Sequence, residues 1–187
     1  MGGPSGWCDE GLSPLYCPDR VTEQGQAVPL RDQAQPGVLY FAYGSNLSRT
    51  RMAGRCPASR PLWRAWAPGW ALRFERVATI VPAPSACVPG AVYRLTEACE
   101  AALDRIEGIH EGRYRRHSLT AVDAHGRPMP ALTYVKIDAR RGPPVPAYLG
   151  HIEAGYRDWT LEVWALSQAV SAADAAEPSS TDGGGTL

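Results

Sequence analysis

Basic residues other than arginine are nearly absent from this chain, in which Lys136 is the single lysine. Basic and acidic residues balance at 19 each, so no strongly basic surface is predicted for a nucleic acid or an anionic membrane. No apolar run approaches the roughly 20 residues of a membrane span. The first residues also lack the basic and apolar segments of a secretory signal. We therefore expect a cytosolic protein without nucleic-acid or membrane partners. Its preference for arginine, alanine, proline and glycine indicates a GC-rich, bacterial genome.

Metal ligands and disulfide frameworks are not indicated either. The cysteines are odd in number and scattered without a CxxC pair, at Cys8, Cys17, Cys56, Cys87 and Cys99. The four histidines never take HxH or HxxxH spacing. There is no GxSxG elbow and no Ser/His/Asp arrangement. The sequence predicts reduced thiols, no metal and no cofactor.

Composition divides the chain into three parts. Residues 1–36 are rich in Gly, Pro, Gln and Asp and predict an irregular arm, whereas 171–187 predict a disordered tail. The domain between them, 37–170, is long enough to bury one hydrophobic core. The pattern leaves open whether the protein is a monomer or a homodimer.

Short apolar runs within this domain predict mainly strands. The first strand is expected at 38–42. Four runs between 62 and 95 (LWRAWA, WALRFER, VATIV and GAVYRL) have the spacing of an antiparallel meander or barrel. Two more strands, at 114–122 and 131–137, are joined by a short turn.

Helices are expected at three places. A short helix begins at Asn46 or Ser48 and ends before Pro57. A second helix begins at Thr96 and ends at Gly108. The last is predicted as one continuous helix, with an apolar face of Ile152, Tyr156, Trp159, Val163 and Leu166. The fold class is therefore α+β, a small mixed β-barrel or strongly curled sheet flanked by helices.

The stretch YFAYGSNL, residues 40–47, carries an apolar strand directly into a turn. Gly44, Ser45 and Asn46 would leave backbone N–H groups without strand partners, and such donors can hold a carboxylate or a developing oxyanion. Gly44 is expected to provide a backbone conformation and a close approach that other residues resist. The same residues also begin many ordinary loops, so the turn alone does not decide the function.

Glu107, the last residue of the second predicted helix, is the candidate acid–base group. It borders the apolar stripe, at the negative end of the helix dipole, with Asp104 and Glu111 nearby. Burial and these charges are expected to raise its pKa, which suits general acid–base catalysis. The alternative is a solvated surface glutamate that pairs with Arg113, Arg115 or Arg116.

Three motifs in this order, YFAYGSNL, ALDRIEG with YRR, and PPVPAYL, resemble the γ-glutamylcyclotransferase-like family. This family includes the plant AIG2-like proteins and the enzyme that removes a γ-glutamyl protecting group in butirosin biosynthesis. The resemblance covers roughly 38–165 and implies a small β-barrel flanked by helices. It implies that Glu107 is catalytic. The residues that it assigns to substrate binding are Tyr40, Tyr43, Gly44, Ser45, Asn46 and Tyr148.

The resemblance also implies the reaction. A small-molecule γ-glutamyl substrate would cyclise and release 5-oxoproline together with an amine or amino acid, without a cofactor. Two alternatives remain: a pathway-specific enzyme that deprotects a natural-product amine, and a non-catalytic binding module that kept the fold. Residues 50–90, which in this family help to select the leaving amine, do not align with it.

Overall fold

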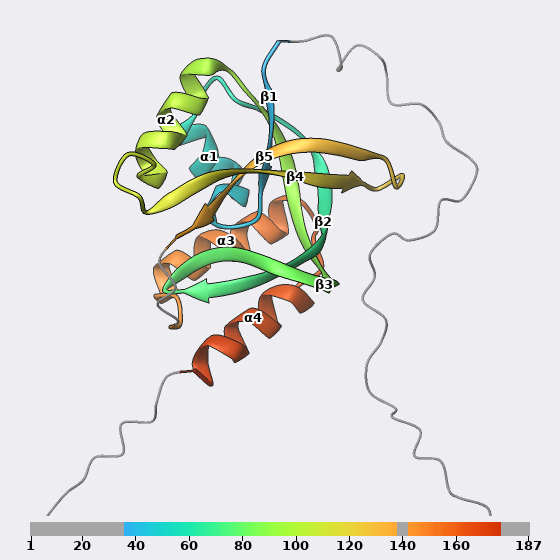
Figure 1. The fold of residues 1–187 in the computed structure, drawn as a ribbon, viewed down its shortest axis with the longest axis vertical. Helices are drawn as coiled ribbons and strands as arrows, with labels where there is room; N and C mark the ends of the chain where they lie inside the picture. Colours follow the sequence, from blue (N-terminus) through green and yellow to red (C-terminus); the bar gives the residue numbers. More distant parts are fainter. Residues whose placement is uncertain (1–35, 138–141, 177–187) are drawn as a thin grey trace, which may run out of the picture.

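A closed five-stranded barrel forms the centre of the computed structural model, which describes residues 36–137 and 142–176 (Figure 1). Its strands lie in the order β1-β3-β2-β4-β5, and the parallel pairing of Tyr40 with Leu132 joins β1 to β5 and closes the barrel. The other neighbours are antiparallel. The strands are β1 (Val38–Ala42), β2 (Arg60–Glu75), β3 (Val77–Leu95), β4 (Tyr114–Asp123) and β5 (Pro128–Lys136). The predicted fold class is confirmed.

Two long strands replace the four short ones predicted between 62 and 95. β2 and β3 pair along most of their length, with register shifts between Pro61 and Trp63 and between Pro68 and Trp70. Proline lacks the N–H that a ladder needs, and an irregularity in the register accommodates it without ending the strand. The prolines that suggested strand ends therefore mark irregularities within continuous strands. Arg76, with a φ of 61°, turns the chain between the two strands.

The first two helices agree with their local signals. α1 (Arg49–Arg55) begins after Ser48, whose hydroxyl accepts a hydrogen bond from the backbone N–H of Arg51. Ser48 rather than Asn46 is therefore the N-cap. α2 (Glu97–Glu107) is capped by Thr96 and ends at Gly108, whose φ of 66° lies in the left-handed region that glycine adopts easily.

The prediction of one continuous final helix is wrong. The chain forms α3 (Pro146–Asp158) and α4 (Trp164–Asp174) instead. The break begins at Trp159, whose indole Nε1 donates to the carbonyl of Leu47, and continues at Thr160 with a φ of 52°. Trp159 is buried as predicted, but it anchors a turn because its partner lies on a distant segment.

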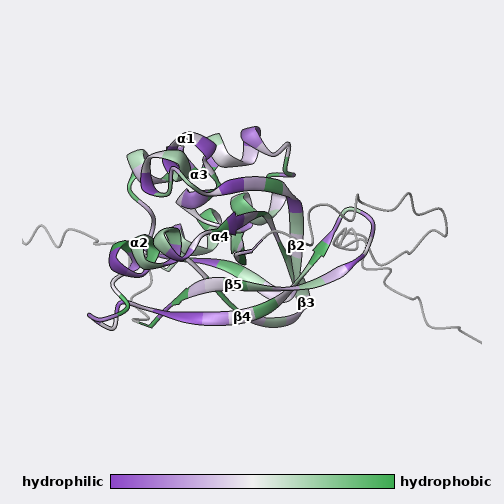
Figure 2. Cartoon of the chain, turned by 90° about the horizontal axis from the view of Figure 1, so that it is seen from above, coloured by the Kyte–Doolittle hydropathy of each residue, from purple (hydrophilic) through white to green (hydrophobic). Residues whose placement is uncertain are grey.

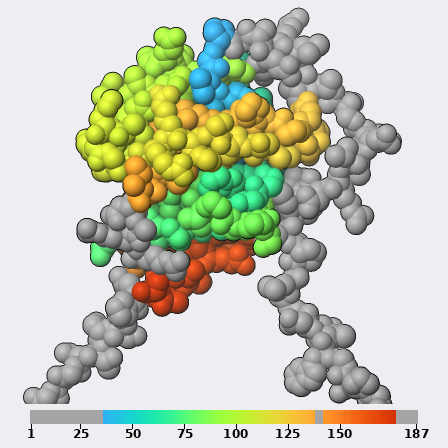
Figure 3. Space-filling model, viewed as in Figure 1, coloured from blue at the N-terminus to red at the C-terminus, as the bar shows by residue number. Residues whose placement is uncertain are grey.

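α4 also extends beyond the expected end of the domain. Residues 171–174, predicted as part of the tail, belong to this helix, and Ala173 is buried. α4 packs against β2, and the space-filling view shows the β2–β3 hairpin between α4 and the layer of β4 and β5 (Figure 3). The rest of the predicted tail from 177 onward, and the predicted arm up to residue 35, lie outside the described residues.

The core lies inside the barrel and beneath its helices. Its largest fully buried side chains include Phe41, Phe74, Tyr93, Leu103 and Tyr156. Hydrophilic residues colour the first part of β4 and much of α1 and α2 (Figure 2). None of the helices in the described part of the chain is long and apolar enough to cross a membrane.

Candidate active site

A pocket of about 340 Å³ collects residues from β1, α2, α3 and the turn between β1 and α1. The residues that the sequence singled out line it together: Tyr40, Tyr43, Gly44, Ser45, Asn46, Glu107 and Tyr148. The wall also contains Arg113, which the sequence analysis considered only as a surface partner of Glu107, and residues that it did not single out: Arg55, Val77, Ala78, Ile106, Tyr114, Tyr134 and Lys136. The fold thus brings the YFAYGSNL, ALDRIEG and PPVPAYL motifs to one cavity.

The turn after β1 is a single 3₁₀ turn, Ser45–Leu47. Leu47 N–H donates to the carbonyl of Gly44 at 2.9 Å, and Ser48 N–H donates to that of Ser45 at 3.3 Å. In the described part of the chain this leaves the N–H groups of Ser45 and Asn46 without a backbone acceptor. Both residues line the pocket, so their N–H groups are the candidate backbone donors of the turn.

Gly44 has a different role from the one that the sequence suggested. Its φ of −108° lies outside the left-handed region that favours glycine, so the structure does not support the expectation that the backbone conformation requires glycine here. A Cβ at this position would lie 3.2 Å from the Cβ of Ala78 and 3.5 Å from the hydroxyl of Tyr148. Glycine keeps the space between the turn, the β2–β3 hairpin and α3 open.

Glu107 projects from the last turn of α2, with its side chain 15% exposed. Burial raises its pKa, and the opposing contributions come first from Arg55 and then from the hydrogen bond with Asn46. The expected direction of the shift agrees with this, but the expected contribution from neighbouring carboxylates does not. Asp104 is held by Arg116 at 2.6 Å and Glu111 by Arg113 at 2.6 Å, so both have their own partners.

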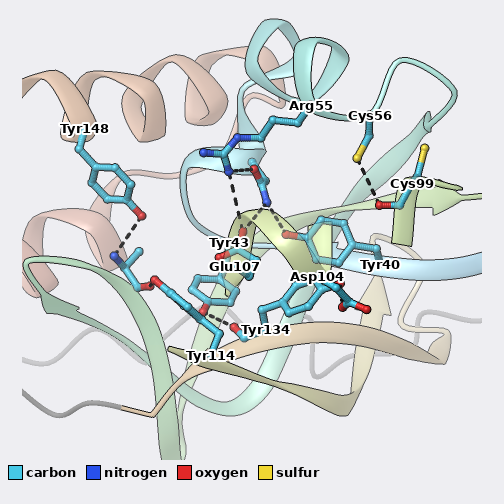
Figure 4. Close-up of polar contacts among 12 residues, drawn as sticks. Tyr40, Tyr43, Arg55, Cys56, Cys99, Asp104, Glu107, Tyr114, Tyr134 and Tyr148 are labelled. Atoms are coloured by element: carbon cyan, nitrogen blue, oxygen red, sulfur yellow. Dashed lines mark hydrogen bonds and ion pairs between the residues drawn. The ribbon is translucent and has the colours of Figure 1, made fainter. Parts of the chain in front are cut away.

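Asn46 connects the turn to the candidate base. Its Nδ2 donates to the hydroxyl of Tyr40 at 2.9 Å and to Oε1 of Glu107 at 3.2 Å. Its Oδ1 accepts a hydrogen bond from Nη1 of Arg55 at 2.7 Å, and the same nitrogen lies 3.8 Å from Oε1 of Glu107 (Figure 4). The predicted alternative, a solvated glutamate paired with Arg113, Arg115 or Arg116, does not fit these contacts.

Most of the pocket tyrosines use their hydroxyl protons within the protein. Tyr43 donates to the carbonyl of Tyr134 at 2.5 Å, and Tyr134 donates to Oδ1 of Asp104 at 2.9 Å. Tyr114 donates more weakly to the carbonyl of Ala78, at 3.4 Å. Burial raises the pKa of each of these three phenols, so all three stay neutral at physiological pH.

Tyr148 is bonded differently. Its oxygen accepts a hydrogen bond from the backbone N–H of Ala78 at 3.1 Å, and it also has a side-chain hydrogen bond with Ser45 that lowers its pKa. Burial is the larger influence and raises the pKa overall. Because the N–H of Ala78 donates to this oxygen, that bond does not use the hydroxyl proton of Tyr148.

The metal and thiol chemistry of the described residues is limited. They contain no group of three or more His, Cys, Asp and Glu side chains that could hold a metal ion. Cys56, Cys87 and Cys99 are buried thiols, and none of them lines the pocket. Burial raises the pKa of Cys56 to about 12, which makes this thiol unreactive.

Sequence reasoning missed Arg55, Tyr114, Tyr134 and Lys136. Arg55 lies on a short helix whose polar sequence suggests a surface position. The other three lie on strands, and their hydrophobic pattern does not indicate which strand ends lie near the Gly44–Asn46 turn. An aromatic residue at the start of a predicted strand, such as Tyr114 just after the Glu107 helix, was the available signal. That signal could not be interpreted from the sequence, because closure of the barrel decides whether Tyr114 reaches the pocket.

Known proteins resemble this chain in sequence and in fold. A γ-glutamylcyclotransferase from Bos taurus is 29% identical over 131 residues, which cover 64% of this chain and 70% of the bovine protein. The corresponding protein from Mus musculus is 30% identical over 122 residues, covering 59% of this chain and 65% of its own length. The alignments therefore span about two thirds of each relative.

A solved structure titled γ-glutamyl cyclotransferase aligns with a TM-score of 0.66 at 25% identity. The alignment covers 81% of this chain and 94% of that one. The model of the family described as "Gamma-glutamyl cyclotransferase, AIG2-like" matches residues 40–160, which include the pocket-lining turn, Glu107 and Tyr148. The resemblance predicted from the three motifs is confirmed, and the chain belongs to the γ-glutamyl cyclotransferase, AIG2-like family.

Proposed function

We propose that this protein is a γ-glutamyl cyclotransferase that cleaves a γ-glutamyl amide and releases 5-oxoproline and an amine. The observation that carries the proposal is the placement of Glu107. It is a largely buried carboxylate with a raised pKa, in the same pocket as the two backbone donors of the turn. Family membership and the names of the relatives support the same reaction.

The reaction needs no external nucleophile. The α-amine of the glutamyl group attacks its own γ-carbonyl carbon, forming the ring C–N bond, and the amide C–N bond to the leaving amine then breaks. Holding the substrate in the bent conformation can contribute about 7 to 11 kcal/mol to lowering the barrier. A narrow pocket of about 340 Å³ is suited to selecting such a compact conformer.

Glu107 would move the proton. An α-ammonium group has a pKa of roughly 8, so a carboxylate with a raised pKa can accept its proton and free the attacking lone pair. The same carboxyl group then donates this proton to the departing nitrogen. The ring nitrogen loses a second proton as the lactam forms, and the leaving amine takes it up and departs as an ammonium, so the enzyme ends the cycle in its starting state. Proton and electron balance require no metal or redox partner.

The turn and Tyr148 would bind the parts of the substrate that carry negative charge. The N–H groups of Ser45 and Asn46 can donate to the glutamyl carboxylate or to the oxyanion that develops on the γ-carbonyl. The hydroxyl of Tyr148, which lies beside the turn, would add a third donor. Tyr40 and Tyr43 would pack around the same end of the substrate.

The charge of the pocket favours a γ-glutamyl amino acid over a cationic natural-product amine. Arg113 and Lys136 line the pocket, and Arg55 accompanies Glu107. Positive side chains attract the carboxylate of a leaving amino acid and repel a polyamine. The deprotecting alternative therefore has less support from the site.

Two matched substrates test the proposal. γ-Glutamyl-alanine and γ-glutamyl-ethylamine differ by the carboxylate of the leaving group, and γ-glutamyl-putrescine adds a positive charge instead. We expect 5-oxoproline release to be fastest with the alanine compound. Faster release from an amine would favour the deprotecting enzyme, and no release from any γ-glutamyl compound would favour a binding module.

A further inference from the structure

Arg55 has no part in the proton transfer proposed above beyond its positive charge, yet its guanidinium lies beside the candidate base. Nη1 donates to Oδ1 of Asn46 at 2.7 Å and lies 3.8 Å from Oε1 of Glu107. Its side chain is 22% exposed, so the contact is partly shielded from solvent. The residue thus bridges the turn and the end of α2.

The chemistry of arginine determines which way the Asn46 amide points. A guanidinium has N–H donors and no acceptor, so the amide group facing Arg55 must be the oxygen. The Tyr40 hydroxyl and the Glu107 carboxyl group could each pair with either the oxygen or the nitrogen of the amide, because each can donate or accept. Arg55 can only donate, so it pairs only with the amide oxygen. The Nδ2 of Asn46 therefore faces Glu107, and a hydrogen bond reaches Oε1.

The main chain holds Arg55 in place. It is the last residue of α1, and Cys56 follows as the C-cap, with its N–H bonded to the carbonyl of Met52 at 2.8 Å. The buried Cys56 thiol contacts the carbonyl of Cys99 on α2 at 3.5 Å (Figure 4). The end of α1 is thus packed against the helix that ends in Glu107.

We propose that Arg55 is a positioning residue, which acts through the Asn46 amide to hold the Glu107 carboxylate by Oε1 and leaves Oε2 to exchange the proton with the substrate. Oε1 receives both contacts, from Asn46 and from Arg55. Neither of these two contacts involves Oε2. The catalytic part of this inference rests on the proposed function.

Several other groups face Glu107 and act on its charge. The cations that lower its pKa are, in order of effect, Arg55, Arg113 and Arg51, and Lys136 lines the same pocket. The neutral phenols around it are Tyr40, Tyr43, Tyr114, Tyr134 and Tyr148, each with a raised pKa. Arg51 lies on α1 as well but has no hydrogen bond to Asn46, so it is a matched control for charge alone.

The test compares Arg55→Met with Arg51→Met. The pKa of Glu107 is measured directly by ¹³C NMR of the glutamate carboxyl carbons, with the Glu107 signal identified by its loss in Glu107→Gln. We expect a higher pKa in Arg55→Met than in either wild type or Arg51→Met. The variant loses the Arg55 cation and the hydrogen bond that holds Asn46, and both losses destabilise the ionised form of Glu107. The acidic limb of the pH–rate profile therefore moves to higher pH.

Turnover supplies the second readout. A displaced carboxylate lowers kcat on the order of 10²-fold in Arg55→Met, with a much smaller change in KM. Arg51→Met keeps most of its kcat. Arg55→Lys, whose ammonium is also a donor without an acceptor, restores part of the lost rate, and it replaces Arg55→Met if that variant does not fold by circular dichroism.

Two results would overturn the inference. One is a Glu107 titration in Arg55→Met that matches wild type, and the other is an equally large shift in Arg51→Met, which would reduce the effect to charge at a distance. The NMR titration does not need turnover. If wild type releases no 5-oxoproline but the pKa values differ as expected, the proposed function fails and the positioning by Arg55 stands.

Discussion

Replacing Glu107 by glutamine separates its chemical role from its structural one. The amide oxygen of glutamine can still accept the hydrogen bond that Asn46 donates to Oε1, so the pocket keeps its shape. What is lost is the group that accepts and returns the proton. Loss of a general base lowers turnover about 10²- to 10⁴-fold, which corresponds to about 2.7 to 5.4 kcal/mol in the activation barrier.

The matched control is Glu111→Gln. Glu111 lies four residues further along, with its side chain 65% exposed and bound to Arg113 on the surface. An exposed ion pair of this kind contributes little, so this variant should turn over at nearly the wild-type rate. Release of 5-oxoproline from γ-glutamyl-alanine is the assay for both variants. If Glu107→Gln kept more than about a tenth of the rate, or Glu111→Gln lost as much, the base would have to lie elsewhere.

The same substitution should change stability in a pH-dependent way. A carboxyl group whose folded-state pKa is raised contributes stability below its unfolded pKa of about 4.3 and loses that contribution as the pH rises through the folded-state value. Ionised Glu107 thus lowers the free energy of unfolding at neutral pH. Glu107→Gln should unfold in urea at a concentration equal to or above wild type at pH 7, with the difference shrinking towards pH 4. The opposite trend would contradict the assignment of burial as the main cause of the shift.

Three other predictions follow from the pocket and the composition. Gly44→Val should abolish binding of 5-oxoproline, measured by calorimetry, while the protein stays folded, because a side chain there meets Ala78 and Tyr148. Ser45→Ala should lose at most about 1 kcal/mol of affinity. Unchanged binding in Gly44→Val would mean that the turn only connects β1 to α1 and does not bind the ligand. Activity should survive EDTA and thiol alkylation, and loss that zinc reverses would require a metal. Removing 177–187 should leave Tm and rate unchanged, and a fall of several degrees would show that this segment packs on the domain.

The parts of the fold that depend on neighbouring residues were predictable. Thr96 and Gly108 bound α2 as expected, because a hydroxyl cap and a left-handed glycine act within one turn of helix. The first strand at 38–42 and the β4–β5 hairpin also match, since an apolar run bounded by turn residues is a local pattern. The same holds for Glu107, whose place at the end of an apolar stripe marked it as an unusual carboxylate before its partners were known.

The sequence by itself thus determined most of the secondary structure, the family and the candidate site residues. The tertiary structure decided what those residues do to one another. Closure of the barrel through β1 and β5 brings Tyr134 beside Tyr43, 91 positions away, and the packing of α1 on α2 brings Arg55 to Asn46 and Glu107. Such contacts join residues far apart in the chain, so no local pattern encodes them, and the charge state of Glu107 depends on them directly.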